Sequence, residues 1–282
     1  MKMGKLLLCN SMVGKSIQLA GYKHIHMLNG YTLPKDKSTV FKYMPLDRFV
    51  KSVDNKELVF VSPETWYDPF EQLYYGIDCS SRGYNTEDIV CMCVSEKSST
   101  NEDACWRVYA SANSKTVRLS IEQDVLLKLL DDYSNSEGYE VYIGKVNYLY
   151  EKKDIKGLHN PSSLLYNEYF PATMKVEHYL SLMLLKRKSF NYENEVRIFM
   201  VRNSITDRLL KIPCDYKVNK LLSNVMLSPY PPVREEGDLA FKVREKINKT
   251  ESEEIKSVLK EKVGCRIQQS LLYKVYPKVK NV

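Results

Sequence analysis

The stretch NYENEVRIFM, residues 191–200, carries its three charged side chains at alternating positions, 193, 195 and 197, and apolar side chains at 196, 198 and 200. Successive side chains of a strand point to opposite faces of a sheet, so an alternation with a period of two predicts a β-strand. Val196, Ile198 and Met200 would lie on one face of this strand. Their apolar character indicates that this face packs on the core of the protein.

The opposite face of the same strand carries charge. Glu193, Glu195 and Arg197 would share it, with the two carboxylates about 7 Å apart along the strand. One interpretation is a solvent-facing surface on which Arg197 relieves the repulsion between the glutamates. The other interpretation is an active site, in which a pair of fixed carboxylates acts on a substrate.

Two further segments combine large aromatic side chains with charge. Residues 62–72, SPETWYDPFEQ, follow a predicted strand and carry three acidic residues close to Trp66. Residues 105–122, CWRVYASANSKTVRLSIE, place Arg107 next to Trp106. Aromatic and polar groups where a loop leaves a strand are typical of a binding cleft. Alternatively, these two tryptophans, the only two in the chain, belong to the core.

The composition indicates a globular protein. Of the 282 residues 44% are hydrophobic and 21 are Tyr, so burial can offset the entropy of ordering the chain. The net charge of +7, from 42 basic and 35 acidic residues mixed along the chain, is compatible with a polyanionic partner. The apolar run before Asn10 has only four residues, too short for a secretory signal or a spanning helix. We therefore expect a soluble cytoplasmic protein with no membrane association.

The seven cysteines are odd in number and scattered, which favours reduced thiols over a disulfide framework. Cys91 and Cys93 would share a strand face, as would His24 and His26, and either pair suggests a metal. No second Cys or His pair stands at the spacing of a zinc finger. We therefore expect buried cysteines and no metal site.

Hydrophobic periodicity and turn residues predict many short elements. Strands are predicted at residues 39–45, 56–63, 88–96, 115–122, 139–150, 195–201, 224–230 and 270–277. Residues 151–171 are predicted as a loop, and helices at residues 46–55, 121–134 (behind a capping box of Ser120 and Gln123), 174–190 and 234–262. The pattern indicates a single α+β domain at residues 38–282 after an N-terminal extension at residues 1–37.

Four stretches carry a family resemblance: FKYMP (residues 41–45), ELVFVSPETWYDPFE (57–71), CWRVYA (105–110) and YENEVRIF (192–199). Together they resemble the bacterial domain-of-unknown-function family 2971. That family is typified by a Y-K-Y-like first strand, an N-D-P-F-E turn, a W-x-x-Y segment and an E-x-E-x-R strand. The most specific match is DPFE at residues 68–71, with Tyr67 where the family usually has Asn. The resemblance runs from Phe41 to the terminal strand.

That family is in turn remotely similar to ADP-ribosyltransferases. The similarity implies an ADP-ribosyltransferase-like fold, with a split, mostly antiparallel sheet of short strands flanked by helices. Lys42 stands where these enzymes have a first-strand His, and Ser62 supplies a hydroxyl at the second strand. Glu195 takes the place of the catalytic glutamate. Glu193 takes the place of the preceding acid, which in these enzymes interacts with the molecule that receives the ADP-ribose.

The similarity also implies NAD as the substrate. Cleavage of the nicotinamide glycosidic bond develops positive charge on the ribose, which Glu195 would stabilise while Glu193 accepts the proton of the incoming nucleophile. Cationic side chains would pair with the pyrophosphate, and aromatic rings would stack on nicotinamide or adenine. The NAD-binding residues so implied are Lys42, Tyr43, Ser62, Trp66, Asp68, Trp106, Arg107, Tyr109 and Arg197.

The resulting expectation is an NAD-dependent ADP-ribosyltransferase, a toxin or phage-defence effector that modifies nucleic acid or protein and has an antitoxin partner. The net positive charge of the chain favours RNA or DNA as the acceptor. Two alternatives remain open. One is a non-catalytic module that binds nucleic acid or protein. The other is a hydrolase of an N-glycosidic bond, in which water attacks the same cation.

Overall fold

A computed structural model describes residues 12–34, 39–66, 68, 71, 89–96, 102–109, 115–150, 152–202, 208–229 and 238–272. The chain divides into two compact units, each of three separate stretches. Unit 1 comprises Met1–Val40, Leu58–Ser99 and Gln123–Ile212, and unit 2 comprises Phe41–Glu57, Thr100–Glu122 and Pro213–Val282. Both units contain strands and helices, which confirms the mixed α and β structure expected from the sequence.

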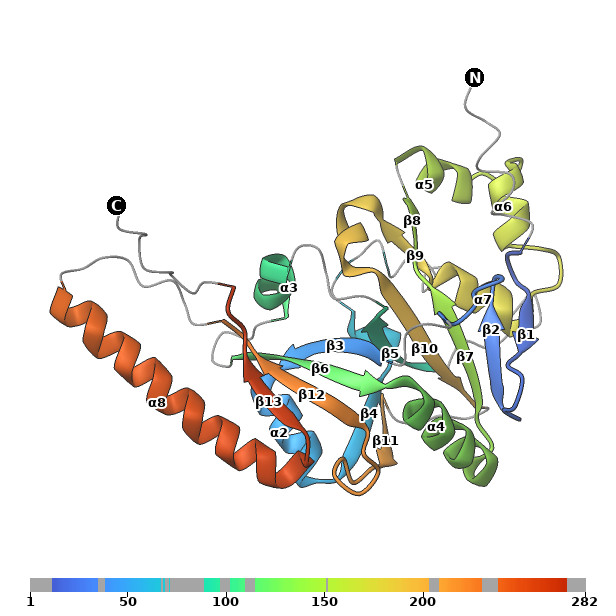
Figure 1. The fold of residues 1–282 in the computed structure, drawn as a ribbon. Helices are drawn as coiled ribbons and strands as arrows, with labels where there is room; N and C mark the ends of the chain where they lie inside the picture. Colours follow the sequence, from blue (N-terminus) through green and yellow to red (C-terminus); the bar gives the residue numbers. More distant parts are fainter. Residues whose placement is uncertain are drawn as a thin grey trace. The chain divides into compact units, whose positions relative to one another are not determined.

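The sheet of unit 1 is mostly antiparallel and has β10 in its interior (Figure 1). Its strands follow the order β1-β2-β7-β10-β5, and β4 pairs with both β5 and β11. Their bounds are β1 Ser16–Gln18, β2 Ile25–Leu28, β4 Glu57–Val61, β5 Ile89–Ser95, β7 Glu140–Lys145, β10 Glu195–Val201 and β11 Leu209–Pro213. β10 is antiparallel to both neighbours, with Arg197 opposite Cys93 on β5 and opposite Gly144 on β7.

The strand predicted from NYENEVRIFM is confirmed, but it begins later than the charge alternation suggests. β10 starts at Glu195, and every residue from there to Met200 is buried. The neighbours Phe199 and Met200, on opposite faces, both have 0% exposure. The interpretation of a solvent-facing charged surface is therefore wrong, because an interior strand of this sheet is covered on both faces.

The first described residues belong to the sheet of unit 1. β2 runs parallel to β7, with Ile25 opposite Val141 and His26 opposite Tyr142. β1 pairs with β2 in the antiparallel direction. Leu28, the last residue of β2, is completely buried. Part of the segment expected as an N-terminal extension thus contributes to the core of unit 1.

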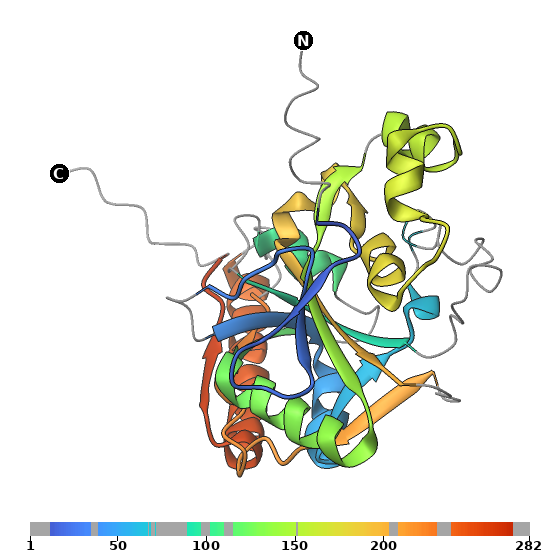
Figure 2. The ribbon, with the colours of Figure 1, turned by 90° about the vertical axis from the view of Figure 1, so that its right-hand side faces the viewer.

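The helices of unit 1 lie around this sheet and a second, two-stranded sheet. They are α4 Gln123–Glu137, α5 Lys152–Leu158, α6 Leu164–Tyr169 and α7 Val176–Leu182, with the 3₁₀ helices η1 Pro63–Thr65 and η4 Lys188–Glu193. The second sheet is a parallel pair, β8 (Asn147–Tyr150) with β9 (Leu185–Arg187). α6 contacts both α5 and α7, and the three lie together in both views (Figure 1 and Figure 2). Their buried side chains and Phe199 of β10 form one apolar cluster.

The loop predicted at residues 151–171 is wrong, because the segment contains α5 and α6. Both helices are short, and isolated helices of that length are marginal in water. Packing stabilises them here, since Leu158 of α5 and Tyr169 of α6 are both buried. The turn residues Gly157 and Pro161, which favour a loop, lie within α5 and between the two helices.

The helix predicted at residues 174–190 is only partly confirmed. α7 ends at Leu182, and the chain continues as β9 and η4. β9 forms because Leu185 and Arg187 pair with β8, a tertiary contact that overrides local helix propensity. The expected capping box is wrong as well, because Ser120 pairs within a strand and α4 begins at its expected partner residue, Gln123.

The sheet of unit 2 has the order β3-β6-β12-β13. Its elements are β3 Thr39–Pro45, α2 Leu46–Asp54, α3 Glu102–Val108, β6 Thr116–Glu122, β12 Leu222–Leu227, α8 Asp238–Val263 and β13 Arg266–Gln269. α8 contacts both α2 and β13 (Figure 1). The terminal strand lies earlier than predicted: Gly264, with φ 67°, follows the end of α8, and β13 then runs parallel to β12. Residues 273–277 of that prediction lie outside the described residues.

Candidate active site

The charged residues around β10 lie in a buried group of ionisable side chains in unit 1, Glu71, Lys186, Glu193, Glu195 and Arg197, here named the carboxylate cluster. Nζ of Lys186 donates to Oε2 of Glu193 at 2.6 Å and to Oε2 of Glu195 at 2.9 Å. The same nitrogen lies 3.2 Å from Oε1 of Glu71. The exposed fractions run from 1% for Arg197 to 8% for Lys186 and Glu71. One buried ammonium thus holds three carboxylates.

Arg197 holds two of the same carboxylates from its own side. Its Nε donates to Oε1 of Glu195 at 2.8 Å, and its Nη2 donates to Oε2 of Glu71 at 2.7 Å. Its Nη1 donates to the carbonyl oxygen of Met183. The ring of Trp66 lies over the guanidinium, with Cζ 4.0 Å from the ring centroid. Every nitrogen of Arg197 has a partner, so this side chain positions Glu195 and Glu71.

Glu193 reaches the cluster by a route that differs from the expected one. It is the last residue of η4 and lies outside the strand. Asn194 then adopts a left-handed conformation with φ 45°, which turns the chain into β10. The expected reason for the convergence of Glu193 and Glu195, a shared strand face, is therefore wrong. The two carboxylates nevertheless meet at Lys186.

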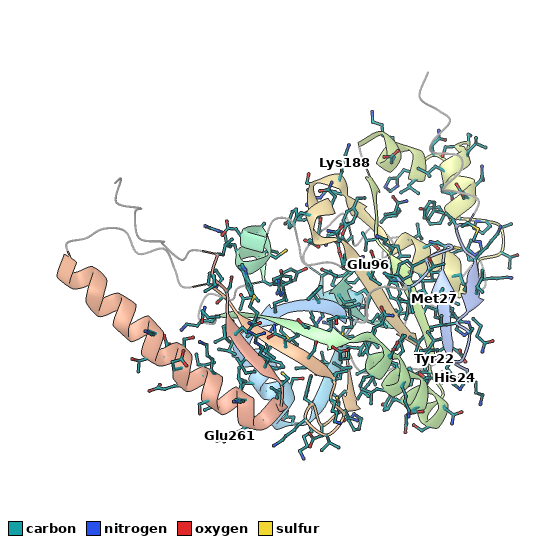
Figure 3. All side chains as sticks on the ribbon, viewed as in Figure 1. Tyr22, His24, Met27, Glu96, Lys188 and Glu261 are labelled. Carbon is teal, nitrogen blue, oxygen red and sulfur yellow. The ribbon has the colours of Figure 1, made fainter. Side chains whose placement is uncertain are left out.

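The cluster lies at the start of β10. Figure 3 labels Lys188, the first residue of η4, and Glu96, which directly follows β5. The backbone N–H of Glu96 donates to the carbonyl oxygen of Asn194 at 3.2 Å. This bond ties the end of β5 to the residue that precedes β10, so the position of Glu195 is fixed by both strands.

The two glutamates have opposite pKa shifts. Burial raises the pKa of Glu193 to about 7, against the opposing charge of Lys186. Burial also opposes the ionisation of Glu195, but Arg197 and Lys186 hold the pKa of this carboxyl well below its usual range. At neutral pH Glu195 is ionised, while Glu193 is partly protonated. Two carboxyl groups whose pKa values are driven apart are typical of an acid–base pair.

A second ion pair and a second ring lie beside the cluster. Nη2 of Arg187, on β9, donates to Oδ2 of Asp68 at 2.9 Å. The ring centroid of Phe190, on η4, lies 5.1 Å from both Nζ of Lys186 and Cζ of Arg187. Asp68 and Glu71 both come from the DPFE motif, so this motif and the strand β10 meet in one site.

Glu195 has two further partners. Its backbone N–H donates to Oη of Tyr148, on β8, at 2.8 Å. The thiol of Cys93, on β5, hydrogen-bonds its carboxylate and helps to lower the pKa of that carboxyl. A hydrogen bond with Cys91, together with burial, raises the pKa of Cys93, so the thiol stays neutral. Burial likewise raises the pKa of Tyr148.

The residues expected to bind NAD are distributed over both units: Ser62, Trp66, Asp68 and Arg197 lie in unit 1, and Lys42, Tyr43, Trp106, Arg107 and Tyr109 lie in unit 2. Trp66 and Arg197 contact each other, and Asp68 pairs beside them with Arg187. The hydroxyl of Ser62 accepts from the backbone N–H of Glu64 at 3.3 Å and caps η1. Ser62 therefore has a local structural role.

The expected aromatic residues of unit 2 form a group of their own. The ring of Tyr43 packs edge-on against Trp106 with centroids 5.1 Å apart, and stacks on Tyr109 at 6.0 Å. Tyr43 and Trp106 are buried, and Nε1 of Trp106 has no hydrogen-bond partner among the described residues. Arg107 is exposed and pairs with Asp103 at 2.9 Å on the same helix. Trp106 thus belongs to the core of unit 2.

Sequence reasoning missed four residues of the site: Glu71, Tyr148, Lys186 and Arg187. The basic run at residues 186–188 falls in a segment that was predicted as a helix, so no period-two pattern directed attention to it. One signal was available, because buried carboxylates require cations, and this run is the nearest basic run before Glu193. Glu71 belongs to a quoted motif, but its distance in sequence from β10 gave no hint of the contact.

The other motifs give no metal centre in the described part of the chain. No group of three or more His, Cys, Asp or Glu residues there is arranged to hold a metal ion. His24 and His26 both contact one carboxylate, that of Glu140, at 3.1 and 2.7 Å. Cys91 and Cys93 are in the thiol form, with no disulfide between them. Among the described helices, none has the length and apolar character needed to span a bilayer.

Comparison of the chain with protein-family models, with curated proteins and with solved structures gave no match.

Proposed function

We propose that the protein is an NAD-dependent ADP-ribosyltransferase, with an ADP-ribosyltransferase-like fold and the carboxylate cluster as its catalytic centre. The proposal is carried by one observation, the contact of Glu193 and Glu195 with Lys186 under opposite pKa shifts. Transfer needs one carboxylate that stays ionised and one that takes up a proton near neutral pH. The resemblance of four stretches to family 2971 supports the same assignment.

Glu195 stabilises the cation that forms when the glycosidic bond breaks. The bond between C1′ of the ribose and the nicotinamide nitrogen breaks heterolytically, and its electron pair goes to the ring. A fixed carboxylate lowers the energy of the resulting ribosyl cation. Arg197 and Lys186 hold Glu195 from two directions, and Tyr148 accepts a hydrogen bond from its backbone. The carboxylate is therefore preorganised.

Glu193 is the general base. A hydroxyl or amine of the acceptor attacks C1′, and its proton passes to the carboxylate of Glu193. One glycosidic bond is broken and one is formed, so atoms and charge balance. A pKa of about 7 suits this role, because the group is partly ionised at neutral pH and can release the proton again.

The residues of the cluster suit NAD as a substrate. The nicotinamide of NAD is cationic, and the site holds three carboxylates and two aromatic rings that already contact cations, Trp66 and Phe190. The basic balance of the chain, +7, favours a nucleic-acid acceptor, with protein as the alternative acceptor. The proposal includes a role as a cytoplasmic toxin or phage-defence effector that an antitoxin protein restrains.

The test is transfer of label from NAD. Purified protein is incubated with NAD labelled in its ADP-ribose part and with RNA, DNA or cell extract, and release of free nicotinamide is followed in parallel. The wild-type protein is expected to label a macromolecule. Glu195→Gln is expected to transfer at least about 100-fold more slowly, since loss of one stabilising group in a buried site costs that much.

The matched control is Glu137→Gln, the same substitution at an exposed position of unit 1. It is expected to transfer at the wild-type rate, and thermal unfolding of both variants checks that they fold. Nicotinamide release without labelled product would identify a hydrolase of the N-glycosidic bond instead. If wild type neither transfers label nor releases nicotinamide, the proposed function is rejected.

A further inference from the structure

The segment that leads into β1 lies against α7, a helix that follows 161 to 167 positions later in the chain (Figure 1). The backbone N–H of Gly14 donates to both Oγ of Ser181 and Oδ1 of Asn29, at 3.2 Å in each case. These two acceptors lie 2.9 Å apart. Oγ of Ser16 donates to Oε1 of Glu177 at 2.9 Å. These five residues, here named the α7 clasp, join the start of the described chain to α7.

The clasp requires a glycine at its centre. Gly14 has φ 69°, and a Cβ atom at this position would lie 2.2 Å from Cδ2 of His178 on α7. The imidazole ring therefore packs directly on the backbone of Gly14, an approach that only glycine allows. Burial lowers the pKa of His178, so the ring is neutral at pH 7. The preceding residue, Val13, packs against the apolar cluster below α7.

The clasp lies two residues before the end of α7, and this end contacts the carboxylate cluster. The carbonyl oxygen of Ser181 accepts from the backbone N–H of Leu184 at 3.2 Å. Between these two residues lies Met183, the C-cap of α7, whose carbonyl oxygen accepts from Nη1 of Arg197. A Cβ atom on Gly144 of β7 would lie 2.5 Å from Cδ1 of Leu184. The end of α7 is thus packed between the clasp and the sheet.

The carbonyl group of Met183 restricts the orientation of Arg197. The guanidinium is planar and its donors form a rigid fork, so a partner at Nη1 determines where Nε and Nη2 can point. Those two nitrogens donate to Glu195 and Glu71, respectively. If the carbonyl group moved away, Nη1 would be left as an unsatisfied buried donor, and a rotation that gave it a new partner would carry Nε away from Glu195.

We propose that the α7 clasp is a positioning device for the carboxylate cluster: it holds the end of α7 so that the Met183 carbonyl keeps Arg197 aligned with Glu195. The inference rests on the proposed function only for its effect on transfer. The ionisation of the cluster reports on the clasp directly. A clasp that served stability alone would change the free energy of unfolding and leave the carboxyl groups of the folded protein unchanged.

Two glycine variants test the contact with α7. Gly14→Ala places a methyl group against His178, whereas Gly21→Ala is the control, since Gly21 has φ 88° and a Cβ there would meet no atom within 4 Å. Carbon-13 NMR follows the titration of the glutamate carboxyl groups in the folded proteins, with Glu193→Gln to assign the signal. The midpoint for Glu193 is expected to fall by about one pH unit in Gly14→Ala, because a loosened cluster admits water. It is expected to stay at the wild-type value in Gly21→Ala.

A rescue variant separates the contact from other effects of the substitution. His178→Ala in the Gly14→Ala background removes the ring that the new methyl group meets. The double variant is expected to regain the wild-type midpoint for Glu193 to within a few tenths of a pH unit, because interacting residues depart from additivity. A double variant that behaves like Gly14→Ala would contradict the contact as the cause.

A pair of serine variants tests the hydroxyl group of the clasp. Ser181→Ala removes it, and the control is Ser134→Ala on α4 in the same unit. Both serines are buried, at 1% and 0% exposure, but Oγ of Ser134 has no hydrogen-bond partner among the described residues. Ser181→Ala is expected to lower the Glu193 midpoint and to slow transfer about tenfold or more, and Ser134→Ala to change neither. Should Gly14→Ala fail to fold, this pair decides.

The outcomes separate this inference from the proposed function. The inference is overturned if wild type and the folded clasp variants share one Glu193 midpoint, or if the controls shift it as much as the clasp variants do. A shift confined to the clasp variants, in a protein that neither transfers label nor releases nicotinamide, would reject only the proposed function. Transfer at the wild-type rate by clasp variants with unchanged midpoints would reject only this inference.

Discussion

The ammonium nitrogen of Lys186 lies 2.6 Å from Oε2 of Glu193, the last residue of the 3₁₀ helix that follows β9 in the chain. This contact is the centre of the carboxylate cluster, because the same nitrogen also holds Glu195 and Glu71. A lysine in the middle of the short strand β9 and a glutamate that ends the following 3₁₀ helix, η4, are thus brought together in a buried position. The energetic consequences of this pairing can be measured.

Lys186→Met is expected to destabilise the protein by about 3–5 kcal/mol, because it leaves three buried carboxylates with one guanidinium. Methionine keeps most of the volume of the side chain, so the loss of stability reports the removal of the positive charge. Lys128→Met, at an exposed position of α4 in the same unit, is the control and is expected to cost within about 0.5 kcal/mol. Denaturant unfolding measures both. Equal stability of the two variants would contradict a structural role for the Lys186 ammonium.

The raised pKa of Glu193 makes stability depend on pH. Its folded-state pKa is about 7 against an ordinary value of 4.5, so the folded protein binds this proton more tightly than the unfolded chain. The stabilising contribution of Glu193 is therefore present at low pH and is lost as the pH rises towards 7. Glutamine does not titrate, so Glu193→Gln does not lose this contribution. The unfolding free energy of the variant minus that of wild type is therefore expected to rise by about 3 kcal/mol between pH 4.5 and pH 8.

The measurement is denaturant unfolding of wild type, Glu193→Gln and Glu137→Gln over that pH range. The difference between variant and wild type isolates one group, since Glu195, whose lowered pKa acts in the opposite direction, is present in every protein compared. For Glu137→Gln the difference is expected to stay constant. A constant difference for Glu193→Gln as well would show that Glu193 titrates normally.

The same carboxyl group should control the pH dependence of transfer. The wild-type rate is expected to rise with pH through about 7 and then level off, because the general base must be ionised. Glu193→Gln is expected to be slower by about 10²–10⁴-fold and to lose this rise. Initial rates of label transfer at NAD concentrations well below saturation measure both effects, because these rates report the pKa values of the free protein. An unchanged profile in the variant would assign the base to another residue.

Leu28→Ala is expected to cost about 2–5 kcal/mol, the usual effect of truncating a fully buried leucine. Ile17, on the neighbouring strand β1, is 64% exposed, so Ile17→Ala is expected to change stability by no more than about 0.5 kcal/mol. Thermal or denaturant unfolding of the two variants tests whether β2 belongs to the core of unit 1. Equally small changes in stability for both variants would show that Leu28 does not contribute to the core of unit 1.

Local patterns predicted the strands and helices whose own residues carry the signal. The alternation in residues 195–201 predicted β10, and the helical spacing of Leu46, Phe49 and Val53 predicted α2, whose buried face contains the last two of these residues. Both patterns repeat over a whole element, so they are visible without any partner. The segment 183–194 was misread because its strand and its 3₁₀ helix depend on contacts with β8 and with the cluster.

The sequence by itself determined that Glu195 and Arg197, two residues apart on a strand, lie on the same face, because the two-residue period of a strand needs no tertiary information. Only the tertiary structure decided that this face is buried and that Lys186 and Glu71 complete it. Those two residues lie 9 and 124 positions before Glu195 in the chain. Their approach depends on β9, η4 and the DPFE motif, and on the need to pair charge once it is removed from water.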